Sequence, residues 1–205
     1  VENMVLDTAD TAAYATGIQT VFDKYGRFDI LINNASGPSP GTFDVHGETV
    51  WQQAFQAQLL PLILATQQAV PLMQKNAWGR ILSVSTFLAK EPTPNMVLSA
   101  SFRAAVSAFI KSVSQQMVES GITMNTLCPS AVLTDRARQF AKTKSEEEGV
   151  SLEAAIQLSA DSLPMKRFAT EDEVGGVAAF LCSEQASYIT GHSLAVDGGL
   201  LKSYF

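Results

Sequence analysis

The sequence has few of the residues that build metal centres or disulfide frameworks. Its 205 residues include only two cysteines and two histidines, and no zinc-ligand spacing occurs, so we expect no metal site. Cys128 and Cys182 both lie in apolar runs. This placement is typical of buried thiols, and it favours a cytoplasmic protein kept in a reducing compartment.

Positive charge and long apolar runs are also scarce. The chain carries 14 Lys and Arg against 20 Asp and Glu, which gives a net charge of −6. Surfaces that bind nucleic acids or anionic membranes are basic, so we expect neither partner. No apolar run approaches the roughly 20 residues that a membrane-spanning helix needs.

What remains is a chain suited to a large core. Hydrophobic residues make up 46% and charged residues 17% of the sequence, and its length predicts one domain over residues 1–205. Short apolar runs alternate with longer helical patterns. This alternation predicts an α/β fold, a Rossmann-like doubly wound parallel sheet with helices on both faces. The strands are expected at residues 4–7, 28–34, 79–86, 121–129 and near 194–196, and the helices at 11–25, 48–75, 95–119, 136–165 and 170–182.

Residues 81–111 carry the most chemistry. The strand expected at 79–86 ends in hydroxyl side chains, including Thr86, and the next helix places Ser99 and Arg103 four residues apart on one face. Parallel sheets bind ligands beyond the carboxyl ends of their strands. We therefore predict that Thr86, Ser99 and Arg103 converge on one site.

This stretch resembles the catalytic segment of the short-chain dehydrogenase/reductase family. That family has a Ser at a strand end, a Tyr thirteen residues later and a Lys four residues after the Tyr. The same count in this sequence reaches Thr86, Ser99 and Arg103, and SFRAAVSAFIKS resembles the family's YSASKAAV helix. The frame is kept, but the phenol of pKa about 10 and the titratable ammonium are replaced by a hydroxyl and a guanidinium. Gln58 stands where the family has an Asn that relays protons through a water.

The resemblance also implies a cofactor, NAD or NADP, held by residues on several loops. LDTAD resembles the family's LDVTD, NNAS its NNAG, and the segment after the strand at 121–129 its nicotinamide-binding loop. The residues so assigned to the cofactor, in addition to Arg103, are Asp7, Asn33, Ala35, Ser36, Pro129, Val132 and Thr134. Two readings stay open: the first helix could use Asp7, Thr8 or Asp10 as its cap, and Thr134 could cap the helix that begins at Asp135.

Two functions follow as alternatives. The first is an NAD(P)-dependent oxidoreductase acting on a small-molecule carbonyl or alcohol, with Thr86 on the substrate carbonyl, Arg103 on the ribose, Ser99 as a proton relay and Lys90 as a substitute acid. The second is a degenerate dehydrogenase fold that binds a nucleotide or serves assembly or regulation. The resemblance further implies a substrate lid at residues 135–165. It also implies a homo-oligomer, most simply a tetramer, that uses helices 48–75 and 95–119 at one interface and helix 170–182 with the last strand at the other.

A Gly-rich phosphate-binding turn does not occur before Asp7. By comparison with the family, a first βαβα unit of about fifty residues is missing from this sequence. We expect a longer gene product that includes it. The alternative is a true short form, whose sheet would have an exposed edge.

Overall fold

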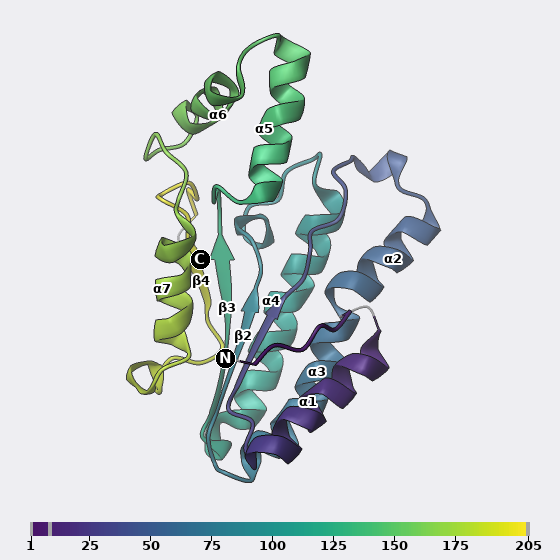
Figure 1. Cartoon of the computed structure of the whole chain (residues 1–205), viewed down its shortest axis with the longest axis vertical. Coiled ribbons are helices and arrows are strands. Elements are labelled where there is room, and N and C mark those ends of the chain that lie inside the picture. Colours follow the sequence, from purple (N-terminus) through teal and green to yellow (C-terminus); the bar gives the residue numbers. More distant parts are fainter. Residues whose placement is uncertain (1, 8–9, 204–205) are drawn as a thin grey trace.

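The computed structural model describes residues 2–7 and 10–203. Its centre is a four-stranded sheet in the order β1-β2-β3-β4, with every neighbouring pair parallel (Figure 1). The carboxyl ends of the four strands therefore meet at one edge of the sheet. The strands are β1 Ile30–Asn34, β2 Gly79–Val84, β3 Ile122–Pro129 and β4 Ser193–Val196.

Helices cover both faces of this sheet, as the sequence predicted. They are α1 Thr11–Tyr25, α2 Glu48–Gln58, α3 Leu60–Gln74, α4 Val97–Met117, α5 Asp135–Glu148, α6 Leu152–Asp161 and α7 Glu171–Leu181. Of the described helices, none is long and apolar enough to cross a membrane.

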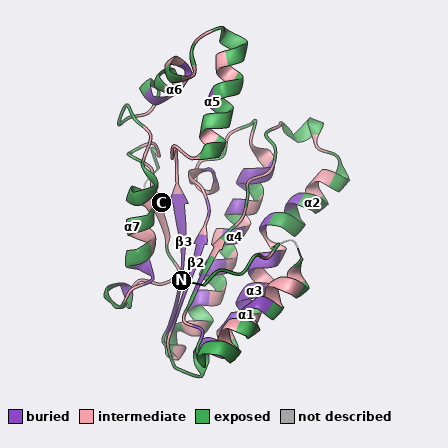
Figure 2. Cartoon of the chain, in the orientation of Figure 1, coloured by how far each residue is buried: buried purple, intermediate pink, exposed green. Residues whose placement is uncertain are grey.

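The alternation of side chains along each strand builds two separate cores. Leu31, Ile81 and Met124 point to one face, where α1, α3 and α4 bury them. Leu82 and Leu127 point to the other face and pack against α7. Figure 2 shows the buried residues running along β2, β3 and the inner sides of α3 and α4. The two cores hold the sheet rigid, so that side chains at its carboxyl edge start from fixed positions.

Local signals in the sequence set several element boundaries. Asp10 caps the start of α1, where its carboxylate accepts from Ala13 N. Gly26 caps its end, with a φ of 69° in the left-handed region that glycine tolerates. Thr170 and Glu173 form a capping box at the start of α7. Pro61 lies in the first turn of α3, so the long pattern at 48–75 is two helices divided at Leu59 rather than one kinked helix.

The strand predicted at residues 4–7 was wrong. The structure shows no regular element there. A strand needs a neighbour to complete its hydrogen bonds, and no strand of the described chain pairs with this segment. Leu6 and Met4 instead pack over Gly17 of α1, where the absent side chain leaves room for them.

Candidate active site at the carboxyl edge of the sheet

A row of polar side chains crosses the sheet near its carboxyl edge. The strand register places Asn33 of β1 beside Ser83 of β2, and Ser83 beside Thr126 of β3. All three share the parity of Leu31, Ile81 and Met124, so they point toward α3 and α4 rather than toward α7. Ser83 is 1% exposed and Thr126 is fully buried. Polar groups in such a place need partners, which makes this row the natural starting point for a site.

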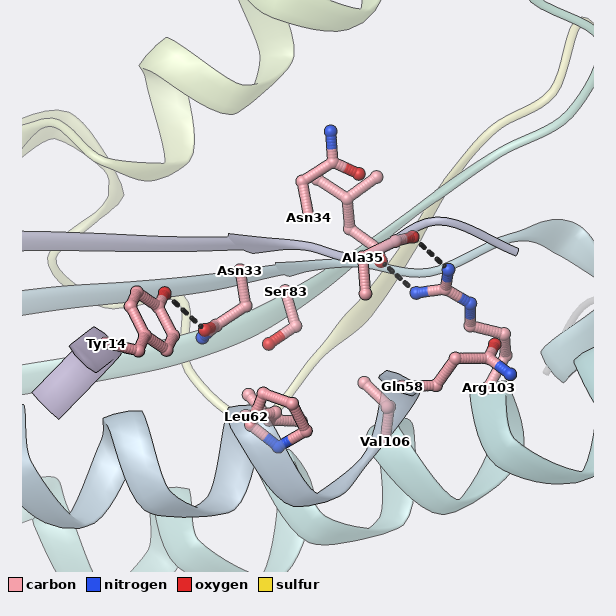
Figure 3. Close-up of a pocket in the computed structure, with 11 residues that line it drawn as sticks. Tyr14, Asn33, Asn34, Ala35, Gln58, Leu62, Ser83, Arg103 and Val106 are labelled. Atoms are coloured by element: carbon pink, nitrogen blue, oxygen red, sulfur yellow. Dashed lines mark hydrogen bonds between the residues drawn. The ribbon is translucent and has the colours of Figure 1, made fainter. Parts of the chain in front are cut away.

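A small cavity of about 30 Å³ lies between this row and the helices (Figure 3). Its walls come from α1, the end of β1, the end of α2, the start of α3, β2 and the middle of α4. The lining residues include Tyr14, Asn33, Ala35, Gln58, Ser83 and Arg103. Four residues that the sequence assigned to the site, Asn33, Ala35, Gln58 and Arg103, are thus brought together by the fold.

The cavity wall carries polar atoms that have no hydrogen-bond partner among the described residues. They are Asn33 Nδ2, both side-chain amide atoms of Gln58, and Ser83 Oγ. Tyr14 Oη donates to Asn33 Oδ1 over 3.4 Å. The oxygen of the Asn33 amide is therefore paired, whereas its NH₂ group is among the groups without a partner. Gln58 is only 2% exposed. Buried polar groups are costly when unpaired, so this cavity suits water or the polar atoms of a ligand.

Arg103 is the one charged residue in the cavity lining, and its side chain reaches from α4 to the ends of two strands. Nη1 donates to Val84 O over 2.8 Å, and Nη2 donates to Ala35 O over 2.5 Å. Arg103 is 6% exposed, and no carboxylate oxygen of the described residues lies within 4.0 Å of it. Burial lowers the pKa of Arg103, and the nearby charge of Arg136 lowers it further. The site therefore holds a fixed positive charge. Its hydrogen-bond acceptors among the described residues are neutral carbonyls.

Thr86 and Ser99 flank this cavity without lining it. Thr86 lies two residues after Val84, the last residue of β2, and precedes a short 3₁₀ turn, Phe87–Ala89, which packs on α4. Ser99 is 5% exposed and lies one helical turn before Arg103. Ser85 Oγ donates to the backbone O of Arg103 over 3.4 Å and so joins the strand end to the helix. The frame Thr86, Ser99 and Arg103 thus occupies one strand end and the helix packed beside it.

The remaining cofactor-side residues are spread over three loops. Pro129 ends β3, and Val132 bridges to Ala169 ahead of α7. Thr134 accepts from Ala137 N over 3.3 Å and caps α5, the role that the sequence left open beside cofactor binding. Ser36 and Asp7 are exposed. Asp10 rather than Asp7 caps α1, and Thr8 lies outside the described residues.

Cys128 lies beneath the same edge of the sheet. It is fully buried at the end of β3. Burial raises the pKa of its thiol, although the charge of Lys90, a hydrogen bond with Ser85 and the charge of Arg103 act in the opposite direction. Cys128 therefore stays a neutral thiol near pH 7 and serves packing rather than nucleophilic chemistry.

Sequence reasoning gave no site role to three residues of this region, although it placed Ser83 among the hydroxyls that end the strand at 79–86. Tyr14 lies on a helix far from any motif, and only the packing of α1 on α3 brings it to Asn33. Ser83 had a signal, because it occupies the same strand face as the core residue Ile81. Arg136 had a signal too. A cation in the first turn of a helix interacts unfavourably with the helix dipole, which indicates that the residue has a role outside the helix.

Comparison with known proteins identifies the family. A family model described as enoyl-(acyl carrier protein) reductase matches residues 1–201. The NADPH-dependent reductase BacG of Bacillus subtilis is 36% identical over 197 residues, covering 96% of this chain and 76% of that protein. This chain belongs to the short-chain dehydrogenase/reductase family.

Solved structures agree with this assignment. The crystal structure of YwfH, an NADPH-dependent reductase involved in bacilysin biosynthesis, has a TM-score of 0.90 at 36% identity, over 98% of this chain and 77% of that one. L-sorbose reductase from Gluconobacter frateurii, complexed with NADPH and L-sorbose, has a TM-score of 0.92 at 28% identity, over 97% of this chain and 76% of that one. These relatives are reductases, and the folds match along nearly the whole of this chain.

Proposed function

We propose that this chain is an NAD(P)-dependent oxidoreductase that interconverts a carbonyl and an alcohol in a small molecule. The observation that carries the proposal is Arg103. It is a buried cation at the carboxyl ends of β1 and β2, held by two carbonyls and by no carboxylate of the described residues. The short-chain dehydrogenase/reductase family has its ribose-binding Lys at this position of the frame. The relatives named above are NADPH-dependent or were solved with NADPH, which supports the same cofactor class.

The residues around the cavity fit such a cofactor. A dinucleotide is anionic and rich in hydroxyl groups, and this edge of the sheet offers a cation together with the unsatisfied amide groups of Asn33 and Gln58. Arg103 would hold ribose hydroxyls. The backbone at Ala35 and Ser36, the loop with Pro129 and Val132, and Thr134 would line the rest of the binding surface, with Asp7 on the adenine side. When bound, the cofactor supplies or accepts the hydride.

The chain's own residues would bind the substrate, transfer the proton and stabilise the developing charge. The Thr86 hydroxyl, at the strand end, would donate to the substrate carbonyl oxygen and hold it in place. Ser99 is far too weak an acid to supply a proton by itself, so it would pass one on from water or from Lys90. The charge of Arg103 would stabilise the oxygen anion as it forms. Gln58 would hold the water through which protons reach the site. Residues 135–165, which contain α5 and α6, would form the lid that closes over the substrate.

Assembly is a further part of the proposal. The outer sides of α2 and α4 carry a cluster of aromatic rings: Trp51 and Phe55 each lie near Phe102, with ring centroids 6.0 and 6.4 Å apart. Phe55 is 38% and Phe180, on α7, is 44% exposed. These apolar surfaces on two sides support a homotetramer with two-fold interfaces in the reducing cytoplasm. Light scattering at micromolar concentration checks it, and a monomer would contradict it.

One experiment tests the function. Nicotinamide fluorescence is followed while NADH or NADPH is titrated into the full chain, and oxidation is then recorded over a panel of ketones and aldehydes. We expect saturable binding of one nucleotide and turnover of at least one carbonyl. Binding without turnover across the panel would refute the enzyme and leave a degenerate dehydrogenase fold that binds a nucleotide. Absence of binding would refute both.

A further inference from the structure

A second arginine, Arg136, crosses the same edge of the sheet. It stands in the first turn of α5, after β3, yet its Nη1 donates to Gly37 O over 2.8 Å and its Nη2 to Pro38 O over 3.0 Å, in the loop after β1. The order of the sheet is β1-β2-β3, so any contact between the loops after β1 and β3 passes over the end of β2. Arg136 therefore spans the strand end from which Thr86 emerges.

Arg103 and Arg136 donate hydrogen bonds to the two ends of one short loop, residues 35–38. Arg103 bonds the carbonyl of Ala35, and Arg136 bonds those of Gly37 and Pro38. The two cations are close enough that Arg136 lowers the pKa of Arg103. Two like charges near each other repel, and an anion between them would relieve that repulsion.

No acidic residue supplies this negative charge within the part of the chain that the structure describes. Arg27, Arg80 and Arg167 each have a carboxylate within 4.0 Å. Arg103 and Arg136 instead donate to carbonyls, and Arg136 also lies 5.3 Å from the ring centroid of Phe140. The chain is acidic, with a net charge of −6, so carboxylates are plentiful elsewhere. The buried, unpartnered amide of Gln58 lines the same cavity as Arg103 and adds a neutral donor to the site.

We propose that Arg136 and Arg103 form a binding site for an oxyanion, a phosphate or a carboxylate, over the carboxyl end of β2. Arg136 is exposed, and its present acceptors are neutral carbonyls, so its side chain can turn to a charged acceptor, which forms the stronger hydrogen bond. Guanidinium groups suit both anions because their planar donors match two oxygens at once. The phosphate source would be the cofactor and rests on the proposed function; the carboxylate source would be the substrate.

The first measurement uses inorganic pyrophosphate and the full chain. Binding is followed by calorimetry at low ionic strength, where charge interactions are least screened. We expect Arg136→Gln to weaken pyrophosphate binding about tenfold or more. Arg138→Gln is the matched control: it removes an exposed arginine of the same helix that does not bond the loop, and it should change the affinity less than about twofold. Equal affinities in the three proteins, or no measurable binding by the unaltered chain, would overturn the proposal.

The second measurement distinguishes the two anions. If the phosphate is the ligand, Arg136→Gln weakens NADPH binding and leaves KM for neutral and acidic substrates in the same ratio. If the carboxylate is the ligand, NADPH affinity is unchanged and the preference for a keto acid over its methyl ester is lost. Failure of the unaltered chain to bind NADPH, with pyrophosphate binding still dependent on Arg136, would refute the proposed function but support the anion site.

Discussion

Replacing Arg103 by Met separates a structural from a functional role for this side chain. The change removes two charge-assisted hydrogen bonds, to Val84 O and Ala35 O, each worth about 1.5–3 kcal/mol. It also removes a buried cation that no carboxylate of the described residues balances, and the desolvation of such an ion costs several kcal/mol. Methionine nearly fills the space. The two contributions oppose each other, so we expect the free energy of unfolding to change by less than about 2 kcal/mol.

The functional effect should be larger. If Arg103 holds the cofactor and stabilises the developing anion, Arg103→Met should weaken NADPH binding about tenfold or more and lower kcat/KM further, because both ligand and transition state lose the same cation. Urea unfolding measures the free energy of unfolding, and nicotinamide fluorescence measures NADPH binding. Arg138→Met, which removes an exposed arginine, is the control. A folded Arg103→Met protein with unchanged NADPH affinity would show that the arginine serves the fold alone. A destabilisation of more than about 4 kcal/mol would refute the expected balance of the two stability contributions.

Three further predictions follow from the same geometry. Thr86→Val should lower turnover roughly ten- to a hundredfold with little change in cofactor affinity, because one hydrogen bond to the substrate is lost; equal losses in both would contradict it. Ser99→Tyr with Arg103→Lys restores the family's acid and ammonium and should raise reductase activity; a folded, cofactor-binding double variant without that gain would refute the alignment of the frame. Arg167 donates to the Glu173 carboxylate through Nη1 and Nη2 and holds the pKa of this carboxyl at about 2 against a usual 4.5. The stability that this ion pair contributes is therefore present above pH 4.5 and is lost as the pH falls toward 2. Glu173→Gln should flatten the acid dependence of Tm in that window, and an unchanged slope would refute the assignment.

The sequence by itself determined the elements whose signals are local. Gly26 ends α1 because only glycine takes a left-handed φ without strain, and the Thr170 and Glu173 pair begins α7 because each side chain satisfies the other's backbone donor. Alternating strands and helices similarly led to a parallel sheet, and a parallel sheet has one edge where its carboxyl ends meet. Spacing along the chain was also the basis for expecting Thr86, Ser99 and Arg103 near that edge.

Tertiary structure decided what depends on neighbours distant in sequence. Residues 4–7 have strand-like residues but form no strand, since hydrogen-bonding partners are a property of the sheet and not of the segment. Arg103 could have reached solvent or a carboxylate. The packing of α4 on β3 and on the turn Phe87–Ala89 places it where it donates to Val84 O and Ala35 O. The link from Arg136 to Gly37 joins residues 99 positions apart. No local pattern encodes such a contact, because the order of strands in the sheet, and not the order of residues in the chain, brings the two loops together.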